Sequence, residues 1–195
     1  MDAAQAHTRP SAFRGMSVST TFNTRELRDA FGSFATGVTV ITARRPDGEP
    51  VGVTANSFTS VSLTPPLALW CIARDSASAV AFADGAVFAV HVLGAAQRDL
   101  ALRFASRGSE KFPAGASLAT HGHAPLVPAA LCRIDCTVEQ TVPGGDHLIV
   151  IGRVTAIDKR PGSPLLFHGG RFGQLETDAT SPAFDIWDSL STEWF

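Results

Sequence analysis

A run of short polar side chains, residues 52–66, is the part of this sequence best suited to hold a ligand. Seven of its fifteen residues are Ser, Thr or Asn. The flanking apolar runs, residues 38–41 and 67–72, predict buried strands. Because buried hydroxyl and amide groups need hydrogen-bond partners, a flat polar ligand lying on the sheet could supply them. The alternative is a set of turn and edge-strand residues that bond their own backbone.

The sequence lacks the common motifs of dinucleotide-binding, nucleotide-binding, zinc-protease and serine-hydrolase sites. The sequence contains no GxGxxG after a strand, no P-loop lysine motif, no HExxH and no GxSxG. His121 and His123 stand in a loop of Pro and Gly without nearby Cys or carboxylates, which is typical of a surface loop. We therefore predict no metal site.

Composition limits the partners and the compartment. The 195 residues predict one domain, and a net charge of −2 gives no reason to expect nucleic acid or an anionic membrane. Only 17% of residues are charged and 45% are hydrophobic, which favours surface buried in an oligomer. Cys71, Cys132 and Cys136 are an odd number, so we expect reduced thiols in the cytoplasm. No apolar run approaches the ~20 residues that span a bilayer, and no signal peptide is expected.

The periodicity of apolar residues predicts a mainly β chain. Asn23 and Glu26 form a capping-box pattern at the start of a helix that Gly37 would stop. The expected helices are residues 24–35, 77–83 and 96–105, and the expected strands are 38–44, 51–55, 67–73, 87–93, 131–142, 148–157, 165–167 and 172–175. These elements do not alternate as βαβ units, so we predict an antiparallel β-barrel with peripheral helices. Residues 1–21 are expected to be a flexible arm, 22–176 the domain, and 177–195 a docking tail.

Several motifs occur in an order that resembles the flavin reductase family. The first is Thr36-Gly37-Val38-Thr39, followed by Thr54-Ala55-Asn56-Ser57-Phe58 with Ser60-Val61-Ser62 and Pro65-Pro66. Asp75-Ser76-Ala77-Ser78, Glu110-Lys111-Phe112 and Gly145-Asp146-His147 come later. The resemblance extends from Phe31 to Leu175 and implies a split β-barrel that binds FMN. His91 stands where the family usually has Asn, and the chain has no tyrosine.

The resemblance also implies roles for individual residues. The residues expected to contact the flavin are Thr36, Thr54, Ala55, Asn56, Ser57, Ser60, Val61, Ser62, Ser76, Ser78, Phe104 and Lys111. Ser76 or Ser78, at a predicted helix N-terminus, would suit the phosphate, and a simple helix cap is the alternative. Lys111 would neutralise the phosphate or lie in solvent. His147, beside Asp146, would contact the nicotinamide or be a histidine of a surface turn.

No side chain is expected to act as acid or base, because flavin accepts hydride at its own N5. The resemblance implies a homodimer that oxidises NADH or NADPH, reduces FMN or FAD, and supplies reduced flavin to a separate monooxygenase. Two alternatives remain. One is a flavin carrier or sensor without turnover. The other is an oxidase of a phosphorylated pyridine vitamer, which usually needs a basic phosphate cluster, whereas Arg and Lys are scattered along this sequence.

Overall fold

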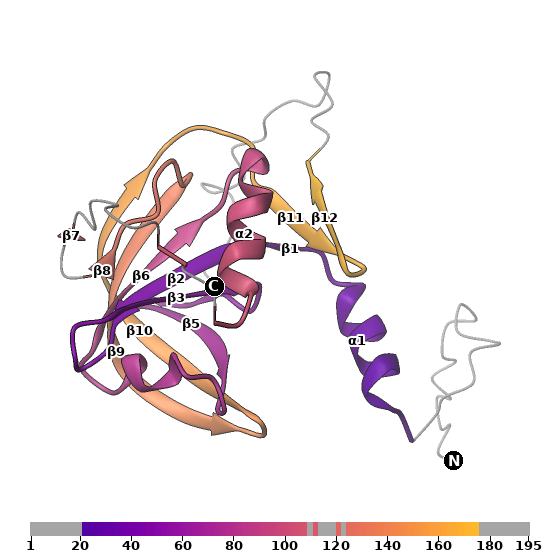
Figure 1. The fold of residues 1–195 in the computed structure, drawn as a ribbon, viewed down its shortest axis with the longest axis horizontal. Coiled ribbons are helices and arrows are strands. Elements are labelled where there is room, and N and C mark those ends of the chain that lie inside the picture. The colour runs from indigo at the N-terminus through magenta and orange to yellow at the C-terminus, as the bar shows by residue number, and fades with distance from the viewer. Residues whose placement is uncertain (1–20, 109–110, 113–119, 122–123, 176–195) are drawn as a thin grey trace, which may run out of the picture.

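The computed structural model describes residues 21–108, 111–112, 120–121 and 124–175 (Figure 1). The expected C-terminal tail and all of the expected N-terminal arm except Thr21 lie outside the described residues. His123, one of the two loop histidines, also lies outside them. Within these ranges no helix is long and apolar enough to cross a membrane.

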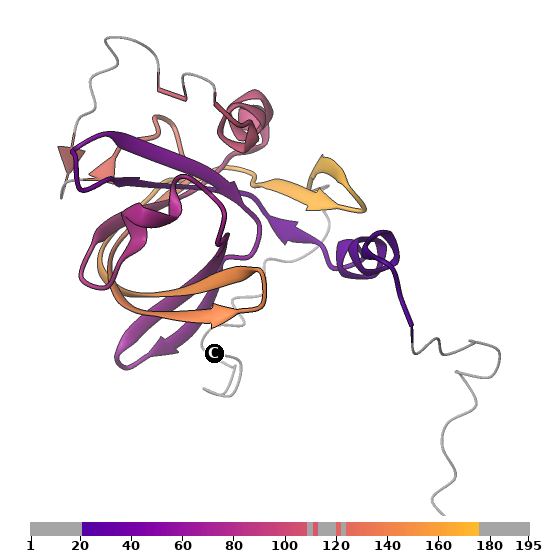
Figure 2. The same cartoon turned by 60° about the horizontal axis from the view of Figure 1, so that its bottom comes forward.

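One antiparallel sheet of seven strands makes up most of the fold. In spatial order its strands are β3 (Pro50–Ala55), β2 (Thr39–Arg44), β6 (Val87–Val92), β9 (Cys132–Gly144), β10 (His147–Lys159), β5 (Pro66–Ala73) and β4 (Thr59–Leu63). Figure 2 shows the strands curling round so that the sheet encloses a core. No ladder joins the two edge strands, β3 and β4. The predicted β-barrel architecture is confirmed, in the form of a split barrel.

Smaller elements surround this barrel. Among the described residues there are two further sheets. In one, β11 (Leu165–His168) lies between β1 (Thr36–Gly37) and β12 (Arg171–Gln174), and in the other β7 (Thr120–His121) pairs with β8 (Ala124–Pro125). The helices are α1 (Thr24–Gly32) and α2 (Arg98–Ala105), and the 3-10 turns are η2 (Ala79–Phe82) and η3 (Ala95–Gln97).

Two predicted helices differ from the structure, one in its end and one in its type. Asn23 and Glu26 do form the expected capping box, but α1 ends at Gly32, and Gly37 lies in strand β1. The helix expected over residues 77–83 is only the 3-10 turn η2, preceded by Ser78. Its apolar residues Ala81 and Phe82 are needed inside the barrel, so packing rather than helix propensity decides their conformation.

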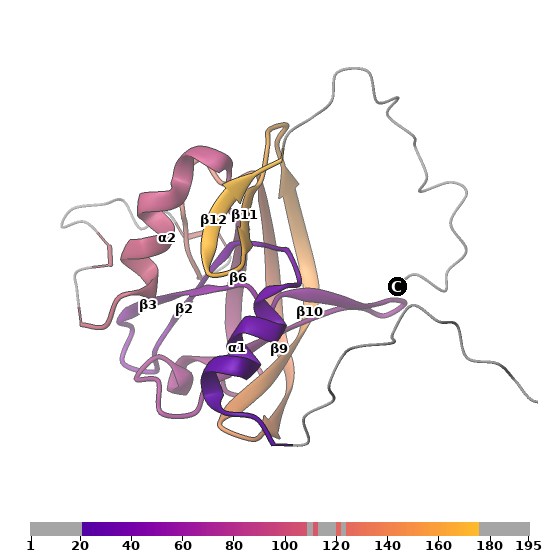
Figure 3. The ribbon, with the colours of Figure 1, turned by 90° about the vertical axis from the view of Figure 1, so that its right-hand side faces the viewer.

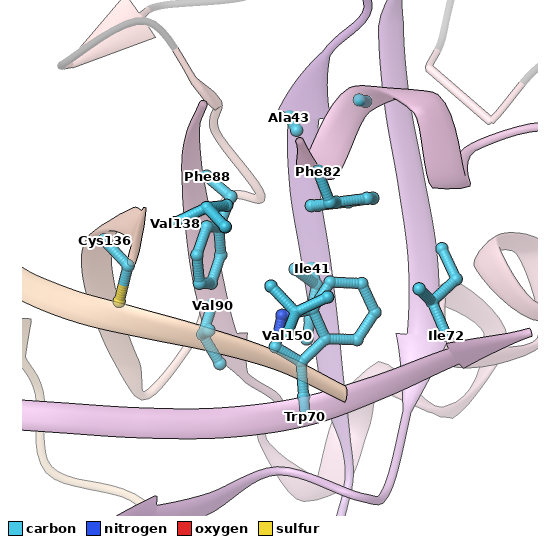
Figure 4. Packing of buried hydrophobic residues seen from close by; sticks show 11 residues of the cluster. Ile41, Ala43, Trp70, Ile72, Phe82, Phe88, Val90, Cys136, Val138 and Val150 are labelled. Carbon is cyan, nitrogen blue, oxygen red and sulfur yellow. The ribbon is translucent and has the colours of Figure 1, made fainter. Parts of the chain in front are cut away.

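The barrel core is aromatic at its centre. Trp70 lies edge-on to Phe82 with ring centroids 4.7 Å apart, and Phe88 completes the group (Figure 4). At Gly152 in β10, an added Cβ would lie 2.8 Å from Cε1 of Phe88, so a glycine is required for this packing. A second cluster joins α2 to the outside of β2 and contains Val38, Val40, Leu93, Ala101, Phe104, Val127 and Leu165. This second cluster fixes α2 beside the strand edge where the candidate site lies.

Helix α1 stands away from the barrel in Figures 1 and 2, and Figure 3 looks from the side of α1, which lies in front of the sheet. None of the residues of α1 is buried; Phe31 in the helix is 73% exposed, and Phe34 just after the helix is 75% exposed. The chain therefore presents apolar side chains on an element that its own barrel does not cover.

Candidate functional site

A cavity of about 770 Å³ lies where the edge strand β3 approaches β5. Its walls come from the end of β3, the end of β5, the segment after β5, the C-terminal end of α2 and the β9–β10 turn. Of the residues predicted to hold flavin or nicotinamide, the cavity brings together Thr54, Ala55, Asn56, Ser57, Ser76, Ser78, Phe104, Lys111 and His147. These residues span about half of the chain, so only the folded barrel can assemble them.

Two of the predicted hydroxyls hold the walls of the cavity in place. The Ser57 Oγ accepts a hydrogen bond from the Cys71 N–H at 2.9 Å and donates to the Cys71 carbonyl at 3.5 Å. This links the loop after β3 to β5 where no ladder connects the strands. The Thr54 hydroxyl donates to the Ala101 carbonyl of α2 at 2.7 Å. By contrast, the exposed Asn56 amide has no hydrogen bond within the described residues, so it is available to a ligand.

These contacts separate the roles of two adjacent residues. We expect Asn56→Ala to weaken flavin binding by about tenfold with the melting temperature unchanged, because it removes only ligand contacts. Ser57→Ala should lower both the flavin affinity and the melting temperature, because it leaves the Cys71 N–H without its partner at a cost of about 1–3 kcal/mol. Flavin fluorescence titration and thermal unfolding of the two variants measure the difference. Equal melting temperatures for both variants would contradict the linking role of Ser57.

The α2 wall is built on Lys111 and Phe104. The Lys111 Nζ donates to the carbonyls of Gly52, at 2.9 Å, and Phe104, at 3.0 Å. The ring of Phe104 packs edge-on against Phe112 with centroids 5.2 Å apart. Partial burial lowers the pKa of Lys111 from its ordinary value. Lys111 therefore joins α2 to β3, which leaves one ammonium N–H for the phosphate contact that the resemblance implies.

The segment after β5 forms a polar turn at the cavity. The Ser76 N–H donates to the Ala73 carbonyl at 3.0 Å, and the Ser78 N–H donates to the Ser76 Oγ at 3.3 Å. The Ser78 hydroxyl makes no capping bond to η2. Because η2 is a single 3-10 turn, the dipole argument for a phosphate at this position does not apply. What Ser76 and Ser78 offer a ligand is hydroxyl and backbone N–H groups.

His147 reaches the cavity from the start of β10, directly after the turn between β9 and β10. Gly145, at a φ of 65°, and Asp146 form this turn. The His147 Nδ1 lies 2.7 Å from Asp146 Oδ1, and this hydrogen bond lowers the pKa of the exposed Asp146 carboxyl. The carboxylate fixes the orientation of the imidazole, while Nε2 has no partner within the described residues. Asp146 itself does not line the cavity.

Four other predicted flavin contacts also lie outside the cavity lining. Thr36 pairs with Phe167 in the small sheet, and its buried hydroxyl has no partner among the described residues. Ser60, Val61 and Ser62 belong to β4, an edge strand within the stretch that the sequence indicated as a polar connection. Ser60 and Ser62 pair with Ala68 and Leu67 of β5, and Val61 lies at the register shift between them. This backbone pairing explains why so many short polar side chains are tolerated there.

The structure adds residues that the sequence did not assign to the site. Arg45, Cys71, Asp75 and Arg107 line the same cavity. Arg45 lies in the turn after β2 and Arg107 follows α2, so no local pattern marks either of them. Their contribution depends on long-range packing.

Comparison with known proteins decides the family. The family model described as "Flavin reductase like domain" matches residues 31–176, which contain the whole cavity. The chain belongs to the flavin reductase family. The sequence-based resemblance is thereby confirmed.

Relatives of this flavin reductase family member include enzymes with either flavin in their names. The chain is 43% identical over 153 residues to FMN reductase (NADH) SmoA of Agrobacterium fabrum, covering 78% of this chain and 87% of SmoA. It is 39% identical over 160 residues to the flavin-dependent monooxygenase reductase subunit HsaB of Rhodococcus jostii, covering 82% of each. The structure of the NADH:FAD oxidoreductase SgcE6 of Streptomyces globisporus, in complex with NAD and FAD fragments, superposes with a TM-score of 0.73 at 40% identity, covering 80% of this chain and 94% of SgcE6.

Proposed function

We propose that this flavin reductase family member oxidises NADH or NADPH, reduces FMN or FAD, and supplies the reduced flavin to a separate monooxygenase component. The observation that carries the proposal is the convergence of Asn56, Ser76, Ser78 and His147 on one cavity. Their amide, hydroxyl and imidazole groups match the polar edge of a flavin, its phosphate and a carboxamide. The names of the relatives support the same reaction.

The flavin, when bound, supplies the hydride chemistry at its N5. The task of the protein is to bind and orient the two reactants. Asn56 and the neighbouring backbone would hold the ring edge, while Phe104 closes one wall and Lys111 fixes that wall to β3. His147, oriented by Asp146, would bind the nicotinamide side. Placing the reacting atoms about 3–3.5 Å apart is the main contribution that such a site makes to the rate.

The direct test is oxidation of NADH and NADPH followed by absorbance, with FMN, FAD or no flavin added. Turnover that requires added flavin is the expected result. A protein that binds flavin without consuming either nicotinamide would contradict the proposal and indicate a flavin carrier or sensor. Product formation by a monooxygenase supplied only with this chain, flavin and the preferred nicotinamide tests the transfer of reduced flavin.

We expect His147→Ala to raise the KM for the nicotinamide by about three- to tenfold, because one hydrogen bond is lost. The Kd for flavin should stay unchanged. Steady-state kinetics at saturating flavin, with a flavin titration alongside, measures both. The matched control is His168→Ala, since His168 is exposed in β11 and outside the cavity lining. An unaltered KM in His147→Ala would mean that His147 is only a histidine of a surface turn.

We also propose a homodimer. Its support is the uncovered α1 with Phe31, the largely exposed Phe34 just after the helix, and the low charge of the chain. Light scattering of the full chain should give twice the mass of one chain, and Phe31→Ser with Phe34→Ser should lower it. A monomeric wild type would contradict the proposal.

We also propose that the protein is located in the cytoplasm, on the support of three cysteines that form no disulfide.

A further inference from the structure

Arg45 lines the flavin cavity with a guanidinium that forms no hydrogen bond within the described residues. Its Nε is buried without a hydrogen-bond partner there, and an oxygen of its ion-pair partner Asp47 lies 3.8 Å from this Nε. The side chain as a whole is 40% exposed, so it lies at the rim of the cavity. Arg44, immediately before it, donates to the Gly48 carbonyl at 2.9 Å and is not part of the lining. A buried N–H without a partner is costly, and a ligand acceptor would remove that cost.

Arg107 approaches the same rim from α2. The Thr54–Ala101 hydrogen bond and the contact between Gly52 and Phe104 show that α2 runs opposite to β3. Residues that follow α2 are therefore directed toward the start of β3, next to the turn that carries Arg45. Arg107 is exposed, lines the cavity, and has no hydrogen bond or ion pair within the described residues.

The rim carries two guanidinium groups in addition to the donors already available to the phosphate on the ribityl chain. Ser76 and Ser78 already offer neutral donors for the phosphate attached to the ribityl chain, and Lys111 is bound to two carbonyls. Two guanidinium groups remain. The carboxylates near them are Asp75 in the lining and Asp47, whose oxygen lies 3.8 Å from Arg45 Nε. Guanidinium groups bind phosphate oxygens through paired N–H donors. The pair is therefore suited to a second phosphate farther out.

We propose that Arg45 and Arg107 bind the distal phosphate of FAD and make this chain prefer FAD to FMN. This inference rests on the proposed function, because it takes flavin as the occupant of the cavity. The exposed position of both side chains fits a dinucleotide whose adenosine half extends past the rim. NADH and NADPH also carry a diphosphate, so the test must separate the two dinucleotides.

The test measures the Kd of oxidised riboflavin, FMN and FAD for Arg45→Gln, Arg107→Gln and the double variant. We expect each single variant to weaken FAD binding by about tenfold and the double variant by more, with the Kd values of FMN and riboflavin unchanged. The matched control is Arg103→Gln, which removes the same charge four residues earlier on α2. Arg103 lies outside the lining, so this variant should leave FAD binding unchanged.

Each other outcome overturns the inference. An equal loss of affinity for FMN and FAD would mean that the arginines bind the proximal phosphate. A loss of affinity that includes riboflavin would mean that they only maintain the shape of the cavity wall. A raised KM for NADH with an unchanged Kd for FAD would assign them to the nicotinamide dinucleotide. Wild-type protein that binds FMN more tightly than FAD would also overturn it. The titration uses oxidised flavin alone and does not depend on turnover. If the variants lost affinity for FAD only, and the wild type did not oxidise NADH, the result would refute the reductase function but not the FAD site.

Discussion

Gly52→Ala is expected to weaken flavin binding by at least about tenfold and to lower the free energy of unfolding by about 1–3 kcal/mol. A Cβ at Gly52 would lie 2.5 Å from Cδ1 of Phe104, well inside van der Waals contact. Phe104 cannot yield easily, because Phe112 packs on its ring and Lys111 holds its carbonyl. The added methyl group must therefore push the α2 wall away from β3. That movement changes the cavity, since Phe104 is part of its lining.

Flavin titration and chemical denaturation of Gly52→Ala measure the two effects together. Gly173→Ala is the matched control, because Gly173 also lies in a strand and a Cβ there would meet no atom within 4 Å. The control should bind flavin as the wild type does. Wild-type affinity in Gly52→Ala would mean that α2 does not define the flavin cavity.

Most of the longer strands were predictable from sequence because their apolar residues follow a strand pattern. The hairpin of β9 and β10 combines alternating apolar residues with a Gly-Asp turn, and Val138 and Val150 on it are buried. Strand β4 was missed because its pairing with β5 satisfies the backbone whatever the side chains are. The expected helix over 77–83 failed because Phe82 must reach the barrel core, which only tertiary packing determines.

The site was predictable only where a motif marks it. The polar stretch and the Gly-Asp-His turn led to Asn56, Ser57 and His147, which the barrel brings to one cavity. Arg45 and Arg107 carry no such signal. They reach the cavity because Gly52 lets α2 lie against β3, and that contact joins segments far apart in the chain.

The free energy of unfolding should fall by about 3 kcal/mol as the pH is lowered from about 6.5 to about 4, because of His91 alone. His91 is fully buried, and its Nδ1–H donates to the Val40 carbonyl at 3.2 Å. Its Nε2 accepts the Val127 N–H at 3.3 Å, so both ring nitrogens are matched to the neutral imidazole. Burial, and to a smaller extent the positive charge of Arg133, lower the pKa of His91 to about 4.

The direction follows from proton binding. The unfolded chain, with an ordinary histidine pKa of 6.5, binds a proton below that pH, whereas folded His91 stays neutral until about pH 4. The contribution of His91 is therefore fully present above pH 6.5 and is lost as the pH falls through this window. Besides Arg133, which is paired with Asp135, the charged residues at the neighbouring cavity of about 310 Å³ are Asp158 and Arg160.

Denaturation at a series of pH values, compared with His91→Asn, isolates this contribution. An asparagine amide can donate to the Val40 carbonyl and accept from the Val127 N–H, but it does not titrate. His91→Asn should therefore keep most of the stability at neutral pH and lose the steep acid dependence. His168→Asn, which changes an exposed histidine, should keep the wild-type profile. If His91→Asn also kept the wild-type dependence on pH, the acid sensitivity would belong to other groups. His91 would then not be the neutral imidazole that joins β6 to β2 and to the segment around Val127.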